Sequence, residues 1–209
     1  LFATLACFHL LPSRRHATLL IASIVFYAFA GLGMLALFIA VSAFAYGCLR
    51  RIEAGDRRFL AIGAIGILGN LIAFKYVAFL LDTIAALGFI NAAPAQDWVT
   101  RHVLLPVGIS FYSFQLLAVL IDASRGQRLD VRSFRELLLF IMFFGHLIAG
   151  PIMRGREFFP QLHQLPGPSS SQLRVGVVLL FVGVIKKAVL ADLLLAPRAD
   201  ALFLAAGDL

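Results

Sequence analysis

The chain has 209 residues, of which 61% are hydrophobic and 14% charged, and its formal net charge is +7 at pH 7. A soluble domain of this size needs much less apolar sequence, so the composition excludes an ordinary soluble fold. Apolar segments recur along the whole chain, whereas a signal peptide has a single short one. The sequence therefore predicts an all-α, polytopic transmembrane protein.

The apolar segments differ in length, and several do not match one simple crossing, which needs roughly 20 apolar residues. The second segment is long enough to cross twice, with Gly31-Leu32-Gly33 as the turn, which makes each crossing short. Short, broken and re-entrant helices are therefore expected. The segments cover residues 1–11, 17–49, 59–90, 103–121, 137–153 and 175–195.

Arginines gather in the short connections between these segments. Positive-inside counting predicts that the connections carrying Arg14-Arg15, Arg50-Arg51, Arg57-Arg58 and residues 125–135 are cytoplasmic. The connection over residues 91–102 has a single arginine against one aspartate and is expected on the opposite side. The positive charge is thus interpreted as setting the topology and as attracting anionic lipid head groups. Membrane lipid is therefore an expected partner, and nucleic acid is not.

No residue pattern for a bound cofactor, a metal or a hydrolase triad is present. Cys7 and Cys48 lie in or beside apolar segments without a partner spacing, so both are predicted to be inert packing residues. His146 and His163 are not joined by further ligands, and Ser110 and Ser113 have no nucleophile elbow. The sequence therefore predicts neither a metal site nor a bound cofactor.

The segment over residues 59–90 contains two features of note. Lys75 stands between Phe74 and Tyr76 inside it, and it is interpreted as marking a helix end from which the lysine reaches the head groups. Small residues at positions 63, 66, 69 and 73 lie along roughly one side of a helix. They predict close approach by a neighbouring helix and need no chemistry.

Residues 137–153 form a short segment with Gly145 and Gly150-Pro151 near its end and arginines on both sides. An odd number of crossings cannot leave both flanks on one side, so the segment is predicted to dip into the membrane and return. Such broken backbone must be covered by protein or water, which would put His146 in an internal cavity. A short ordinary span that breaks the charge rule is the alternative.

The last apolar segment is interrupted after residues 175–185 by Lys186-Lys187, which indicates a membrane interface or, alternatively, a polar cavity. Asp192 lies five residues past Lys187, beyond ordinary helical pairing, so it is not expected to neutralise either lysine. The clearest loop is predicted over residues 166–171.

Three ordered stretches carry a resemblance to a known family. Residues 105–115, LPVGISFYSFQ, with Asp122 and Arg125-Gly126 after them, resemble the signature of the membrane-bound O-acyltransferase (MBOAT) family, in particular its bacterial alginate O-acetylase branch. Residues 146–154 with 159–162 resemble the next family motif, and residues 183–192 resemble a third. Phe74-Lys75-Tyr76, Leu11-Pro12 and Tyr27 also fit the family pattern.

The resemblance implies a helical ring around a thin centre, with a tunnel reached from both faces. It implies transfer of an acyl group, usually acetyl, to a hydroxyl of an extracytoplasmic polysaccharide such as alginate. Residues 1–209 are accordingly expected to form a single membrane domain, the N-terminal portion of a larger acyltransferase. The family's catalytic histidine is expected beyond Leu209, so no catalytic residue is assigned here and this piece alone is expected to be inactive.

Polar residues within the three motifs are the candidates for lining or supporting the tunnel. A structural polar network is the alternative for each of them, and Asp122 and Arg125 could pair at a helix end. The candidates are Gln115, Asp122, Arg125, His146, Arg154, Lys186 and Lys187.

The resemblance also implies the surroundings of the protein. The acyl donor, acetyl-CoA or an acyl carrier, is a co-substrate, and the polysaccharide acceptor and other polysaccharide-acetylation proteins are the expected partners. The expected location is the bacterial inner membrane, crossed many times. A transporter or polysaccharide export component is the alternative function, and a non-catalytic membrane scaffold is another.

Overall fold

A computed structural model describes residues 2–87, 105–147, 150, 153–164 and 169–207. Every regular element in these ranges is a helix, which confirms the predicted all-α fold class. The chain divides into two compact units, Leu1–Leu165 and Pro166–Leu209. The predicted connection at 91–102 and residues 148–149 and 151–152 of the second motif lie outside the described residues.

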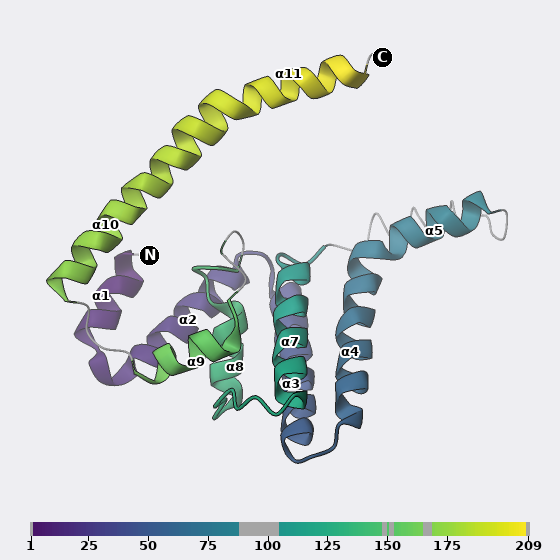
Figure 1. Cartoon of the computed structure of the whole chain (residues 1–209), viewed down its shortest axis with the longest axis vertical. Helices are drawn as coiled ribbons and strands as arrows, with labels where there is room; N and C mark the ends of the chain where they lie inside the picture. The colour runs from purple at the N-terminus through teal and green to yellow at the C-terminus, as the bar shows by residue number, and fades with distance from the viewer. Residues whose placement is uncertain (1, 88–104, 148–149, 151–152, 165–168, 208–209) are drawn as a thin grey trace. The chain divides into compact units, whose positions relative to one another are not determined.

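The first unit contains helices of very different lengths (Figure 1). The helices from Leu32 to Glu53 and from Arg58 to Tyr76 are both long and apolar enough to cross a membrane, and the others are shorter. The elements are α1 (Phe2–Leu10), η1 (Pro12–Arg14), α2 (Arg15–Ala28), α3 (Leu32–Glu53), α4 (Arg58–Leu71), η2 (Ile72–Tyr76), α5 (Val77–Ala86), α7 (Ile109–Ser124), α8 (Phe134–Met142) and α9 (Gly155–His163).

The predicted turn inside residues 17–49 is confirmed. Helix α2 ends at Ala28 and α3 begins at Leu32, so the turn falls slightly before the predicted position and leaves Gly33 inside α3. Gly31 has a φ of 128°, a backbone conformation that residues with a Cβ rarely adopt. The glycine therefore allows the chain to reverse between the two helices.

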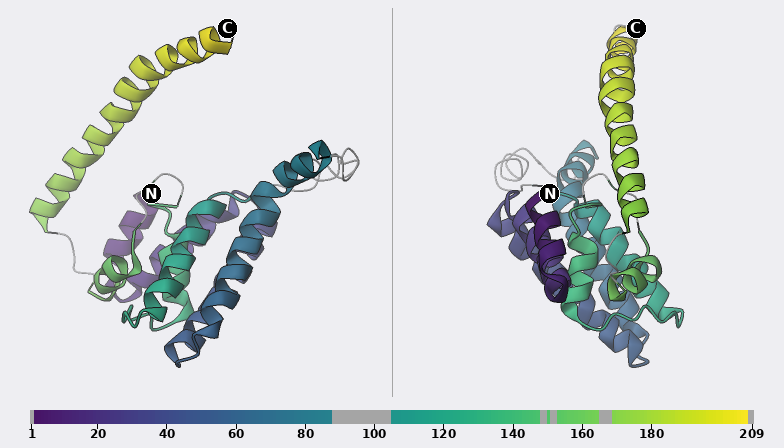
Figure 2. Two further views of the ribbon diagram at one scale, coloured as in Figure 1. Left: turned by 45° about the vertical axis from the view of Figure 1, so that its right-hand side comes forward. Right: turned by 90° about the vertical axis from the view of Figure 1, so that its left-hand side faces the viewer.

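Helices α3, α4 and α7 pack side by side and form the centre of the unit (Figures 1 and 2). Their contact is close at Gly63, where an added Cβ would lie 2.5 Å from Leu120 Cδ1 and 3.3 Å from Cys48 Cβ. Gly69, by contrast, has open space beside it. The predicted packing role of the small residues is therefore confirmed at Gly63 and not at Gly69. Cys48 is a buried packing residue as expected, whereas Cys7 is exposed.

We expect Gly63→Ala to lower the free energy of unfolding by about 1–3 kcal/mol, because the methyl group overpacks a contact between three helices. Gly69→Ala is the matched control and should be neutral or stabilising by about 0.5–1 kcal/mol, since alanine favours the helix. Thermal denaturation in detergent of the protein that carries this chain measures both. Equal effects of the two substitutions would contradict the close packing of α3, α4 and α7.

Lys75 lies in the π-helical turn η2, at the end of the membrane-length helix Arg58–Tyr76 and directly before α5, which agrees with its interpretation as marking a helix end. Its Nζ donates a hydrogen bond of 3.1 Å to Ser110 Oγ. The wider π turn re-aims side chains, a change that the apolar pattern does not reveal.

The chain leaves through α8 and has returned before α9 begins, which confirms the dip and return predicted for residues 137–153. An added Cβ on Gly155, the first residue of α9, would lie 3.6 Å from Leu129, shortly before α8. Each of the two helices has nine residues and extends roughly 13 Å, less than half of the hydrocarbon thickness of about 30 Å. His163, at the end of α9, contacts Glu136 in the first turn of α8, so the chain returns to the end from which it left. An ordinary span would have separated these two residues by the length of the segment.

His163 holds α9 against the start of α8; its side chain is only 9% exposed. The two helices are called the α8–α9 hairpin below. The Nδ1 atom of His163 lies 3.1 Å from Asp130 Oδ2, and its Nε2 lies 3.2 Å from Glu136 Oε2. A protonated imidazole donates to both carboxylates at once. The hydrogen bond from Arg132 holds the pKa of the exposed Asp130 carboxyl below its usual value.

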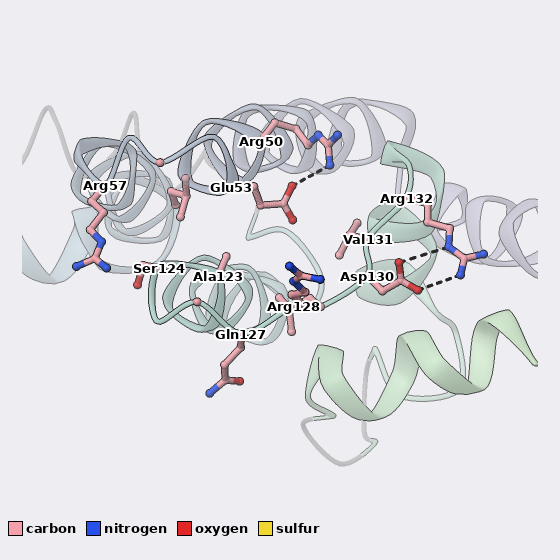
Figure 3. A pocket seen from close by; sticks show the side chains of 14 residues that line it. Arg50, Glu53, Arg57, Ala123, Ser124, Gln127, Arg128, Asp130, Val131 and Arg132 are labelled. Atoms are coloured by element: carbon pink, nitrogen blue, oxygen red, sulfur yellow. Dashed lines mark hydrogen bonds and ion pairs between the residues drawn. The ribbon is translucent and has the colours of Figure 1, made fainter.

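The arginine-rich connections lie at one end of the first unit, as the charge pattern predicts. Arg50 and Arg57 flank the α3–α4 connection and line a pocket of about 880 Å³ together with Arg128 and Arg132 (Figure 3). Arg14 and Arg135 line another pocket, between the start of α2 and the start of α8. The connections around Arg14, Arg50, Arg57 and residues 125–135 therefore share one side of the protein, here called the arginine side.

The second unit is one continuous helix, made of α10 (Ser170–Ile185), the π-helical section η3 (Lys186–Leu195) and α11 (Ala196–Gly207). Two predictions change here. Ser170 and Ser171 belong to α10, which Ser169 and Gln172 begin with a capping box, so they are not part of a loop. Lys187 does pair with Asp192, because the π-helical backbone stacks residues five positions apart.

Candidate functional site

The first motif begins with a turn that positions helix α7. Pro106 is buried, Gly108 adopts the left-handed conformation with a φ of 71°, and α7 starts at Ile109. A Cβ on Gly108 would lie 3.3 Å from the carbonyl oxygen of Leu147. Glycine therefore allows both the turn and the close approach of the second motif, which brings the first two motifs into contact at this point.

Side chains from α2, α4 and η2 hold the start of α7 in place. The Tyr27 hydroxyl donates to the carbonyl oxygen of Val107 at 3.0 Å, and Asn70 Nδ2 donates to the Tyr112 hydroxyl at 3.4 Å. Lys75 donates to Ser110. Tyr27 and Lys75 carry part of the family resemblance, yet the sequence alone did not place either of them at the site. Each of them meets the first motif through a contact between residues distant in sequence.

A pocket of about 190 Å³ opens at this junction. It is lined by Lys75, by residues 105–111 and by Leu147. The Lys75 ammonium and the positive end of the α7 helix dipole both face the junction, because α7 begins there. The pocket therefore joins residues of the first two motifs beside a positive charge.

Both motifs also contain buried polar side chains that have no hydrogen-bond partner. Ser113 is 0% exposed, Gln115 1% and His146 2%. Within the described residues, Ser113 Oγ, both polar atoms of the Gln115 amide and both ring nitrogens of His146 have no hydrogen-bond partner. Buried polar groups are nearly always paired, so such unpaired groups need an explanation.

His146 lies at the bend of the α8–α9 hairpin, as predicted, and its ring is covered by protein. The rings of Phe140, Phe143 and Phe158 contact it edge-on, with centroid distances of 5.6–6.4 Å. His146 does not line any of the three pockets described for this unit.

The remaining candidates do not join this junction. Asp122 is buried and Arg125 exposed near the end of α7, whose 16 residues extend roughly 24 Å from the pocket. The two side chains form no ion pair among the described residues, so the alternative of a pair at the helix end is not found. Arg154 is exposed at the N-cap of α9. Lys186 and Lys187 belong to the second unit and are exposed there.

Comparison with known proteins identifies relatives along nearly the whole chain. The sequence is 36% identical over 206 residues to a protein of Azotobacter vinelandii named probable alginate O-acetylase AlgI, which covers 95% of this chain and 40% of that protein. The protein of the same name in Pseudomonas aeruginosa is 34% identical over 188 residues. A peptidoglycan O-acetyltransferase of Helicobacter pylori is 27% identical over 205 residues.

The chain spans 34–40% of the length of these curated relatives. No family model matches the sequence, and no solved structure matches it. The relatives carry the names of O-acetyltransferases, and the long apolar helices make this a membrane protein. Motifs, helices and relatives agree that the chain belongs to the membrane-bound O-acyltransferase family, beside the alginate O-acetylases.

Proposed function

We propose that the protein carrying this chain transfers an acyl group, most simply acetyl, to a hydroxyl of an extracytoplasmic polysaccharide such as alginate. The observation that carries the proposal is the junction of the first two family motifs. There, Lys75 faces a pocket, and the same motifs contain buried polar groups without partners. Polar groups left unpaired in an apolar interior are suited to a polar substrate that completes their hydrogen bonds.

In this proposal the described residues bind and orient, and the proton is moved by another residue of the whole protein. A neutral histidine takes the proton of the sugar hydroxyl as its oxygen attacks the acyl carbonyl; the thioester C–S bond of the donor then breaks, and the histidine returns the proton to the leaving thiolate. Gln115 and His146 offer hydrogen bonds toward the tunnel, and the hairpin of α8 and α9 excludes lipid from it. Asp122, Arg125, Arg154, Lys186 and Lys187 support the walls of the tunnel or its entrances.

We also propose a membrane location, an acyl donor and partners for the enzyme. The protein crosses the bacterial inner membrane several times, with the arginine side facing the cytoplasm. Acetyl-CoA or an acyl carrier supplies the acyl group from that side, and other polysaccharide-acetylation proteins act with the enzyme on the polymer.

Expression in an alginate-producing strain without its own O-acetylase tests the proposed function. Acetyl ester on the purified alginate is the expected result, measured by proton NMR of the polymer. Alginate that is exported in normal amount but carries no acetyl ester would contradict the proposal. Loss of alginate export without a change in acetyl ester per sugar residue would favour the alternative that the protein is an export component.

In the same system, we expect Arg154→Ala to reduce acetylation of the polymer at least tenfold while membrane abundance falls less than twofold. The exposed arginine is the N-cap residue of α9, where the return within the second motif ends, and its charge is available to a ligand there. Arg156→Ala is the matched control, because Arg156 is exposed two residues later and pairs weakly with Glu157. Parallel loss of acetylation and abundance for Arg154→Ala would indicate a structural role.

A further inference from the structure

A groove of mixed character lies on the arginine side between the starts of α2 and α8. Its volume is about 470 Å³. One end is formed by the charged side chains that flank the two helix starts, and the other by aliphatic side chains of the same two helices. The groove lies about one helix length from the junction of the first two motifs, since α8 leaves the arginine side here and its bend reaches that junction.

The charged end presents two arginines whose charge is not neutralised. Arg14 and Arg135 are both exposed, and neither forms an ion pair among the described residues. Glu136, which also lines the groove, is already engaged by His163 and by the backbone N–H of Arg132. Helices α2 and α8 both begin here, so the positive ends of two helix dipoles add to the two arginines.

The apolar end continues directly from the charged end along α2. Leu20, Ile21 and Ile24 line it from that helix, and Leu139 lines it from α8. Ile21 is 60% exposed, and the outward stripe extends along α2 through Val25, at 52%, to Phe29, at 89%. A positively charged pocket that opens onto an aliphatic channel at the membrane surface matches an amphiphile with an anionic head.

We propose that this groove binds one anionic phospholipid, with its phosphate between Arg14 and Arg135 and an acyl chain along Leu20, Ile21 and Ile24. Charge complementarity selects the head group, and the aliphatic wall selects a lipid over a soluble phosphate. The larger arginine pocket at Arg57 and Arg128 is also lined by Ile52, Leu129 and Val131, but these three side chains are buried and offer no exposed aliphatic surface like that of Ile21 to an acyl chain. The bound lipid would fasten the start of the α8–α9 hairpin to α2.

Purified protein carrying this chain is titrated in detergent with dioleoyl phosphatidylglycerol, with dioleoyl phosphatidylcholine or with inorganic phosphate, and bound lipid is counted by native mass spectrometry. We expect one tightly held phosphatidylglycerol, and binding about tenfold weaker for the double variant Arg14→Gln/Arg135→Gln. The matched control Arg57→Gln/Arg128→Gln removes the same charge from the other pocket and should leave binding unchanged. Ile21→Gln, an exposed substitution, should weaken the lipid without affecting phosphate.

Several results would overturn the assignment. Equal weakening by both double variants would mean that only the net charge attracts lipid. Equal binding of phosphatidylcholine would remove the role of the arginines, and a response to inorganic phosphate equal to that of the lipid would make the ligand a free anion. No specifically bound lipid at all would mean that another part of the protein covers the groove.

Discussion

Gln115→Leu is expected to raise the thermal stability of the protein and to abolish most of its acyl transfer. The Gln115 side chain is buried, and neither of its polar atoms has a partner among the described residues. Leaving a buried amide unpaired costs roughly 1–3 kcal/mol, and leucine of similar size removes that cost. The same substitution removes the hydrogen bonds that the amide offers to a substrate, so acetylation of the polymer should fall at least tenfold.

Opposite signs of the two effects separate a site residue from a structural one. Thermal denaturation in detergent gives the stability, and NMR of the polymer gives the acetylation. Gln127→Leu is the control, since Gln127 is exposed at the end of α7, and it should change stability by less than about 0.5 kcal/mol. A less stable Gln115→Leu protein would show that the amide is bonded within the whole protein, which is the structural interpretation.

Phe140→Ala is expected to produce the largest loss of stability, about 3–5 kcal/mol. The Phe140 ring is 1% exposed and contacts the rings of Phe158 and Phe159, both at 5.2 Å, and that of His146 at 6.2 Å. It thereby joins α8 to α9 and to the bend between them. Truncation to alanine leaves a cavity between α8 and α9.

Two further variants make this expectation specific. Phe140→Leu should recover more than half of the loss, because it restores most of the volume. Phe29→Ala, at an 89% exposed position in the turn after α2, should change stability little. A similar loss for Phe29→Ala would show that the effect comes from removing any aromatic side chain and not from the hairpin.

The sequence predicted those parts of the fold that follow from charge and backbone freedom. The turn at Gly31 was foreseen because a long uncharged segment between two arginine-rich connections must reverse. The return of the chain after α8 was foreseen because arginines flank the segment on both sides, and an odd number of crossings cannot leave both flanks on one side. Both predictions rest on the cost of moving charge into lipid, which depends on composition and not on the details of packing.

The parts that were not predicted depend on helix register and on contacts between distant residues. The apolar pattern does not show a π-helical turn, so the position of Lys75 within one was not predicted, and Lys187 was left without a partner for the same reason. Tyr27 meets Val107 across 80 residues, and no local pattern shows such a contact. Asp122 and Arg125 have a suitable spacing, but burial of the first and exposure of the second separate them.

The return of the α8–α9 hairpin also bears on how the chain enters the bilayer. Moving one arginine to the centre of a membrane costs on the order of 2.5–3.5 kcal/mol on insertion scales. Both feet of the hairpin stay on the arginine side, so its insertion carries none of these arginines across. The apolar tip, with His146 already wrapped in aromatic rings, can therefore enter from one side after α2 and α7 are in place. Assembly of this part of the protein thus needs no translocation step of its own.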